Sequence, residues 1–338
     1  MRVLITGGAG FIGSHTAGKF CAEGYPVTVL DNLTTGYESN LENLVASSRL
    51  RFINGDICDG ELVKRLVDEA DLVVHLAAMA SVPETIAHPL ESQAINSTAT
   101  LQLLETARHA GVKRFVFASS AAVYGNSTII PQSEGLPVHP LSPYALQKQN
   151  GERYAQLYWQ LYKLPTVSLR FFNVFGPRQR PDSAYSGVIS RFGEAFALGQ
   201  SPVVFGDGHQ SRDFVYVTNV VEAIWLAATQ PVDRVAGEVF NVGTGESISL
   251  LDLIEQFKAI TGRDLVVEHR PSRAGDVRDS RSDLNHSQKR LGYRAVIGWR
   301  EGLKKTWNYF ESLCPSDTRS VTSGPNSRTE HCQERQKD

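Results

Sequence analysis

The feature that most constrains the fold is a glycine-rich turn near the N-terminus. The segment Thr6-Gly7-Gly8-Ala9-Gly10-Phe11-Ile12-Gly13 follows the apolar run Arg2–Thr6 and opens a helical pattern over Gly13–Glu23. Gly7, Gly10 and Gly13 have no Cβ, so the turn can close tightly and a ligand can approach its backbone. A strand, a glycine turn and a helix in this order indicate a pyrophosphate site at a helix N-terminus. The alternative is a tight turn without a ligand.

The remainder of the N-terminal half alternates short apolar runs with helical patterns. Near-continuous Val, Ile, Leu and Phe in the runs is typical of strands that are buried on both faces. We therefore predict an α/β fold with a doubly wound parallel (Rossmann) sheet and right-handed crossovers. The further expected strands are Pro26–Asp31, Leu50–Asn54, Leu72–Leu76, Arg114–Ala118 and Thr166–Phe171, and the expected helices are Gly60–Glu69, Ser92–Ala110 and Pro143–Tyr162.

The pattern becomes irregular after Asn173, which indicates a smaller C-terminal α/β lobe. Helical stretches recur at Val188–Leu198, Val217–Ala228 and Leu250–Thr261. We expect residues 1–173 to form the Rossmann domain, with returning segments at about 213–241, and residues 174–313 to form the interleaved lobe. Residues 314–338 are rich in Ser, Thr, Arg, Glu and Gln, so we expect a disordered tail.

Composition excludes several classes of partner. The chain has 34 Lys and Arg against 36 Asp and Glu, a net charge of −2, which offers no footprint for nucleic acid or an anionic membrane. No apolar run reaches the roughly 18 residues of a membrane span. The apolar start is too short for a signal peptide core, so we expect a cytoplasmic protein. The four cysteines are scattered, which favours neither a metal site nor a disulfide framework.

A dinucleotide would extend from the glycine turn across the ends of the next strands. Asp31 ends the second predicted strand, 18 residues after Gly13. A carboxylate there accepts hydrogen bonds from ribose hydroxyls and repels a 2′-phosphate, which favours NAD over NADP; the alternative is a turn residue. The candidate cofactor-binding residues are Gly7, Gly10, Phe11, Ile12, Gly13, Asp31, Asn32, Asp56, Ile57, Leu76, Ala77, Ala78, Asn96, Tyr144 and Lys148.

Ser120, Tyr144 and Lys148 are the candidate catalytic residues. Tyr144 and Lys148 are four residues apart on the predicted helix, so both side chains project from one face. A phenol titrates near pH 10, and a neighbouring ammonium together with a positive nicotinamide would make it more acidic. Ser120 ends a predicted strand and can hydrogen-bond a reacting hydroxyl. The set indicates proton transfer beside hydride transfer, although a Tyr–Lys pair at this spacing also occurs by chance.

These segments together resemble the extended short-chain dehydrogenases/reductases, and most of all the nucleotide-sugar 4-epimerases. The resemblance covers about Met1–Leu313 and includes Thr6–Gly13, Ser120-Ala121-Ala122-Val123-Tyr124-Gly125 and Ser142-Pro143-Tyr144-Ala145-Leu146-Gln147-Lys148. It implies that Tyr144 takes the proton of the sugar 4-hydroxyl while NAD takes the hydride. The keto sugar would then rotate and receive the hydride on its other face. Relatives that dehydrate their sugar carry an acidic pair where this chain has Ala121 and Ala122, which disfavours dehydration.

The resemblance also implies a grip on a nucleotide diphosphate. Arg212 and Arg273 match phosphate-binding arginines, Asn173 a diphosphate contact and Asp276 a ribose contact. Ser280 matches a gate beside the second carbon of the sugar, where a small side chain leaves room for an N-acetyl group. We therefore expect UDP-sugars, both plain and N-acetylated. The candidate substrate-binding residues are Ser81, Ser120, Asn173, Val188, Val204, Phe205, Arg212, Arg273, Asp276 and Ser280. Ser81 and Ser119 are equally suited to local caps, Val204 and Phe205 to the core.

The helix that carries Tyr144 continues with Tyr154, Leu157, Tyr158 and Leu161 at helical spacing. Relatives dimerise through this helix and the one before it, so we expect a homodimer with an intersubunit four-helix bundle; an internal core face is the alternative. Three other functions remain open: a nucleotide-sugar reductase or dehydratase, a uronic-acid epimerase, and a non-catalytic NAD-binding sensor. No carboxylate-binding environment for a uronic acid can be located in the sequence.

Overall fold

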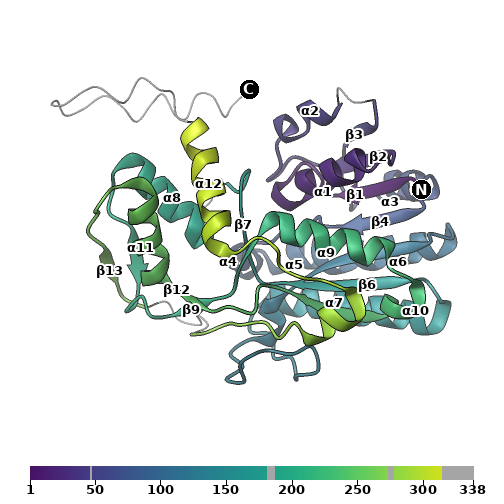
Figure 1. Cartoon of the computed structure of the whole chain (residues 1–338). Helices are drawn as coiled ribbons and strands as arrows, with labels where there is room; N and C mark the ends of the chain where they lie inside the picture. The colour runs from purple at the N-terminus through teal and green to yellow at the C-terminus, as the bar shows by residue number, and fades with distance from the viewer. Residues whose placement is uncertain (46–47, 181–186, 273–277, 314–338) are drawn as a thin grey trace.

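A seven-stranded parallel sheet forms the centre of the protein (Figure 1). The computed structural model describes residues 1–45, 48–180, 187–272 and 278–313. The strand order is β11-β6-β5-β4-β1-β2-β3. This is the doubly wound arrangement, in which later strands are added first on one side of β1 and then on the other. The strands are β1 (Val3–Thr6), β2 (Val27–Asp31), β3 (Leu50–Asn54), β4 (Leu72–His75), β5 (Arg114–Ser120), β6 (Thr166–Phe171) and β11 (Glu238–Val242).

Helices cover both faces of the sheet, as its apolar strands require. On one face α1 (Phe11–Ala22) and α9 (Val217–Thr229) pack Phe20 and Ile224 against the strands. On the other face lie α3 (Gly60–Asp68), α6 (Ala99–His109) and α7 (Pro143–Tyr162), which contribute Val63, Leu103 and Tyr158 to a second core. The sheet is therefore buried on both sides, and only the strand ends remain for a ligand.

The C-terminal lobe has its own core around stacked aromatic rings. Phe196 of α8 (Val188–Leu198) lies on Phe257 of α11 (Leu250–Thr261), with ring centroids 5.3 Å apart, and α12 (Trp299–Leu313) packs beside them. Three two-stranded ladders among the described residues lie outside the central sheet: β7 (Asn173–Phe175) with β10 (Phe214–Tyr216), β8 (Val203–Phe205) with β13 (Glu268–Arg270), and β9 (Ser211–Arg212) with β12 (Ile248–Ser249). The remaining helices are α2 (Glu42–Val45), α4 (Val82–Ala87), α5 (Pro89–Gln93) and α10 (Val232–Val235).

The predicted fold class is confirmed, with differences at particular elements. The helix expected over Ser92–Ala110 is interrupted: α5 leads into a π-helical turn, Ala94–Thr98, before α6 begins. The side chain of Asn96 in this turn bonds the backbone of Met79, and π-turns commonly occur where a side chain has such a task. The six short strands of the lobe were not predicted, because strands of two or three residues carry no periodic signal.

None of the helices among the described residues combines the length and the apolarity that crossing a bilayer requires. Arg273, Asp276 and the predicted tail 314–338 lie outside the described residues. The division at Asn173 stays a prediction, although the lobe core begins at Phe175.

Candidate active site

The glycine turn closes between β1 and α1 as a backbone cradle. A Cβ on Gly13 would lie 2.1 Å from the carbonyl oxygen of Gly7, and one on Gly7 would lie 2.7 Å from the amide nitrogen of Ala77. Both positions therefore require glycine, and Gly7 also has a φ of +71°. Gly10 is the N-cap of α1 and offers no side-chain cap, so the first amides of the helix remain available to an anion. The cradle fits a dinucleotide pyrophosphate.

Acidic groups follow the next two strands at the same edge. Asp31 accepts hydrogen bonds from the amides of Ala9 and Leu33, both at 2.9 Å, which fixes its carboxylate beside the turn. Asn32 donates to Asp56 at 2.9 Å. Burial acts to raise the pKa of Asp56, but hydrogen bonds from Cys58 and Asn32 outweigh it and lower that pKa below its usual value. Ile57, which was predicted to contact the cofactor, is buried and packs in the second core.

Ser120, Tyr144 and Lys148 come together where β5 ends and α7 begins. Ser142 caps α7 through the amide of Ala145, and Pro143 occupies the first turn, which places Tyr144 at the positive end of a 20-residue helix. The Ser120 hydroxyl is close enough to the Tyr144 phenol to act on its pKa, and it accepts a hydrogen bond from the amide of Ala122 at 3.2 Å. The ammonium of Lys148 donates to the carbonyl of Ala118 at 2.8 Å and lies 5.8 Å from the centroid of the Tyr144 ring.

The electrostatics differ in part from the sequence-based expectation. Burial raises the pKa of Tyr144, and the hydrogen bond with Ser120 offsets this only in part. The expected acidification is therefore not produced by this chain alone, because Lys148 is engaged with Ala118 and not with the phenol. Burial lowers the pKa of Lys148 to about 8. Near neutral pH the lysine is mostly charged, and an additional positive charge beside the partly buried Tyr144 phenol would help to ionise it.

A hydrogen-bond chain that the sequence did not predict runs from Thr6, next to the glycine turn, through His75 and Thr100 to Asn96. His75 is buried, and burial together with the charge of Lys148 lowers its pKa to about 3, so the ring is neutral. The Thr100 hydroxyl donates to the Asn96 carbonyl at 2.7 Å and therefore accepts from His75 Nε2 at 2.9 Å. His75 Nδ1 then accepts from Thr6 at 2.7 Å. The chain joins the end of β1 to the start of α6.

Asn96 was predicted to contact the cofactor, and its side chain is already engaged. Its amide nitrogen donates to the Met79 carbonyl at 3.0 Å and to Gln147 at 2.7 Å, while its oxygen accepts from the Met79 amide. Gln147 lies on α7 between Tyr144 and Lys148. Asn96 thus connects the segment after β4 with the helix that carries the candidate catalytic residues.

The structure brings Asn173, Arg212 and Ser280 together next to this site. Ser120 pairs with Phe171 in the sheet, so Asn173 begins β7 two residues beyond the candidate catalytic edge. Asn173 Nδ2 lies 3.5 Å from Ser280 Oγ. The carbonyl oxygen of Ser211 accepts two hydrogen bonds, one from the Arg212 side chain and one from the Ser280 amide at 3.1 Å. Hydrogen bonds therefore connect these segments, which are far apart in sequence, and Ser280 is buried between them.

The other substrate candidates fall into different environments. Val204 is completely buried in the lobe core, in line with the core alternative, while Phe205 and Val188 are partly exposed nearby. Ser81 caps α4 through the amide of Glu84 at 3.2 Å. Ser119 points away from the edge: it is buried and donates to Glu152, which also holds Arg170 in a buried ion pair. Of the two neighbouring serines, only Ser120 faces Tyr144.

Comparison with known proteins identifies the class. Residues 3–243 match the model of the NAD dependent epimerase/dehydratase family. The chain belongs to this family, and it is an NAD-dependent enzyme of the nucleotide-sugar epimerase/dehydratase type.

Individual relatives are similar over almost the whole chain. A UDP-glucose 4-epimerase of Mycolicibacterium smegmatis is 38% identical, and the match covers 92% of this chain and 99% of that protein. The crystal structure of the UDP-glucose 4-epimerase of Thermotoga maritima with UDP-glucose is 38% identical, with a TM-score of 0.87 over 93% of this chain and 99% of that one. The UDP-N-acetylglucosamine 4-epimerase of Methanobrevibacter ruminantium is 36% identical, with a TM-score of 0.88 and the same coverage.

Proposed function

We propose that this chain is a UDP-sugar 4-epimerase that interconverts gluco and galacto configurations through a transient 4-keto sugar. The observation that carries the proposal is the Ser120–Tyr144 hydroxyl pair backed by Lys148 and followed by Ala121 and Ala122. The pair can remove a proton from a sugar hydroxyl. The two alanines offer no acid or base, and dehydration needs a second proton transfer to expel water.

Each residue has a defined part in the proposed reaction. Ser120 holds the oxygen at the fourth carbon, and Tyr144 takes its proton. The glycine turn Gly7–Gly13 would hold NAD, whose chemistry at that carbon would be reversible hydride transfer. After the keto sugar has rotated about its diphosphate and presents its other face, Tyr144 returns the proton to the same oxygen. Lys148 holds the positive charge that favours the phenolate, and because its pKa is about 8 this charge is present at neutral pH.

The substrate is proposed to be UDP-GlcNAc/UDP-GalNAc, UDP-Glc/UDP-Gal or both. Relatives of both kinds resemble this chain to a similar degree, so the names alone do not decide between them. Asn173, Arg212 and Ser280 are the described residues that would hold the diphosphate and border the sugar. The small side chain of Ser280 favours a site that admits an N-acetyl group.

Incubation of the purified protein with UDP-glucose and UDP-GlcNAc separately, followed by NMR, tests the proposal. We expect the galacto isomer without added reductant. Tyr144→Phe should lower the rate about 10²–10⁴-fold, as expected for the loss of a general acid–base group. Tyr154→Phe is the matched control on α7: it removes a tyrosine hydroxyl outside the candidate catalytic set, keeps the ring that the proposed dimer face uses, and should keep the rate. A 4-keto-6-deoxy product, stoichiometric use of reduced cofactor, or NAD binding without turnover would each contradict the proposal.

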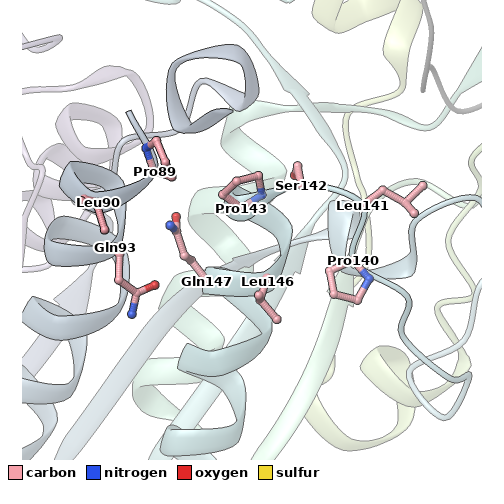
Figure 2. Close-up of a pocket in the computed structure, with 9 residues that line it drawn as sticks. All are labelled: Pro89, Leu90, Gln93, Pro140, Leu141, Ser142, Pro143, Leu146 and Gln147. Atoms are coloured by element: carbon pink, nitrogen blue, oxygen red, sulfur yellow. The ribbon is translucent and has the colours of Figure 1, made fainter. Parts of the chain in front are cut away.

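We also propose a homodimer that packs through α7. This helix exposes Leu146, Tyr154, Leu157, Leu161 and Tyr162, and Leu90 of α5 is 86% exposed. Figure 2 shows the groove between α5 and the start of α7, where Leu90 lies across from Pro143 and Leu146. The groove has a volume of about 520 Å³ and does not include Tyr144. A second copy would present the same apolar face, and its α7 together with the preceding helical segment, residues 92–110, would complete a four-helix bundle.

A further inference from the structure

Asp213 carries a fully buried carboxylate that five hydrogen-bond donors surround. Oδ1 accepts from the amide and the hydroxyl of Thr244, both at 2.7 Å. Oδ2 accepts from the Ser282 hydroxyl at 2.6 Å and from the amides of Ser282 and Gly245 at 3.0 Å. Within the described ranges Asp213 forms no ion pair, so these dipoles hold the negative charge. A buried carboxylate is costly unless its donors are fixed in this way.

The backbone of the same residue extends the connection to a further segment. The Asp213 carbonyl accepts from the amide of Asn173 at 3.0 Å and from its side chain at 3.3 Å. The Asp213 amide lies 3.5 Å from Ser280 Oγ. Arg212 precedes Asp213 directly in the chain. Asp213 therefore connects Asn173, Arg212 and Ser280, three of the described residues that are proposed to contact the nucleotide sugar.

The surroundings are shaped for this charge. A Cβ on Gly243 would lie 2.7 Å from Asp213 Oδ2 and 2.4 Å from Ser282 Oγ, so only glycine fits there. The Gly243 carbonyl is in turn held by the hydroxyl of buried Tyr293 at 2.8 Å. Burial is the main cause that raises the pKa of Tyr293, and the charge of Asp213 adds to it, which keeps this hydroxyl protonated as a donor.

We propose that Asp213 is the positioning residue of the substrate site, which sets the mutual geometry of Asn173, Arg212 and Ser280. It acts on the affinity for the nucleotide sugar and not on the cofactor, because its contacts lie in the lobe and in the strand β7 that leads to it. The proposal rests on the proposed function for the identity of the ligand.

Asp213→Asn tests the proposal, since it keeps the shape but turns an amide group toward donors. We expect the dissociation constant for UDP, measured by calorimetry, and the KM for the UDP-sugar to rise about tenfold or more. The value of kcat should change less than about threefold, and the protein should retain its NAD. The matched control is Leu253→Ala, which removes a buried side chain from the core of the same lobe. It should lower the melting temperature but leave UDP affinity within about twofold.

A milder variant covers the case in which Asp213→Asn fails to fold. Ser282→Ala removes only the hydroxyl donor at 2.6 Å and should weaken UDP binding in the same direction. Unchanged UDP affinity in both variants, or a loss equal to that of Leu253→Ala, would overturn the proposal, as would a parallel loss of NAD. A wild-type protein that binds UDP but does not epimerise either sugar would instead refute the proposed function, because the calorimetric readout needs no turnover.

Discussion

His75 is a single residue whose protonation state bears on the whole cofactor cradle. Its neutral ring accepts from Thr6 and donates to Thr100, and a second proton would leave Nδ1 unable to accept. His75 is buried, and burial is the main cause that lowers its pKa from 6.5 to about 3. Folding therefore excludes a proton that the unfolded chain binds below pH 6.5.

The sign of the resulting pH dependence follows from this difference. Since the unfolded state binds more protons, the stability that His75 contributes is present above pH 6.5 and is lost as the pH falls toward 3. Between pH 7.5 and 5.5 we expect this group to lower the free energy of unfolding by about 1 kcal/mol. Urea unfolding of wild type and His75→Gln at both pH values measures it. In His75→Gln this change in the free energy of unfolding between the two pH values should disappear. Leu104→Ala, the control in the core beside His75, should be destabilised by the same amount at both pH values. A His75→Gln variant that keeps the wild-type pH dependence would refute the assignment.

Ser280 is a second single residue with a predicted effect, because its side chain is expected to select which sugar is accepted. Its hydroxyl lies 3.5 Å from Asn173 Nδ2, at the edge of the proposed sugar site. Ser280→Tyr should abolish most turnover of UDP-GlcNAc and retain that of UDP-glucose, because the larger ring fills the space for an N-acetyl group. Activity on the plain hexose serves as the folding control. Unchanged N-acetyl turnover would count against a gate at this position.

Among the elements, the first strand, the glycine turn and the first helix form the cradle that is proposed to hold the cofactor pyrophosphate. The two glycines of α1 provide a matched pair of variants. A Cβ at Gly13 would lie 2.1 Å from a backbone oxygen, while one at Gly18 would meet only the methyls of Leu44, at 3.8 and 3.9 Å. Gly13→Ala should weaken NAD binding at least tenfold, or about 1.4 kcal/mol. Gly18→Ala should keep NAD affinity and stabilise α1 by up to about 1 kcal/mol. Calorimetric titration with NAD and a melting curve separate the two; equal NAD affinity would show that the turn does not hold the pyrophosphate.

At the scale of the whole molecule, the exposed stripe on α7 predicts the oligomeric state. Light scattering should give the mass of a dimer for the wild type. Leu157→Glu or Leu161→Glu should shift the mass toward the monomer, because each places a charge in the proposed bundle. Leu198→Glu, at a 56% exposed position on α8, should leave the dimer intact. A monomeric wild type would contradict the proposed assembly.

Sequence patterns alone were sufficient to predict the class of fold, which is confirmed, and to propose the glycine cradle and the Ser120–Tyr144–Lys148 set, which stay predictions. These depend on local signals: apolar strands, glycines at a turn and residues four apart on one helix. Only the tertiary structure decided that Ser119 turns away to Glu152, that Lys148 bonds Ala118 and that Asp213 and His75 connect distant segments. The contacts of Asp213 with Ser282 and of Thr6 with His75 each span 69 residues. No periodic pattern encodes such a pairing, because it arises only when the strands and loops of the folded chain converge.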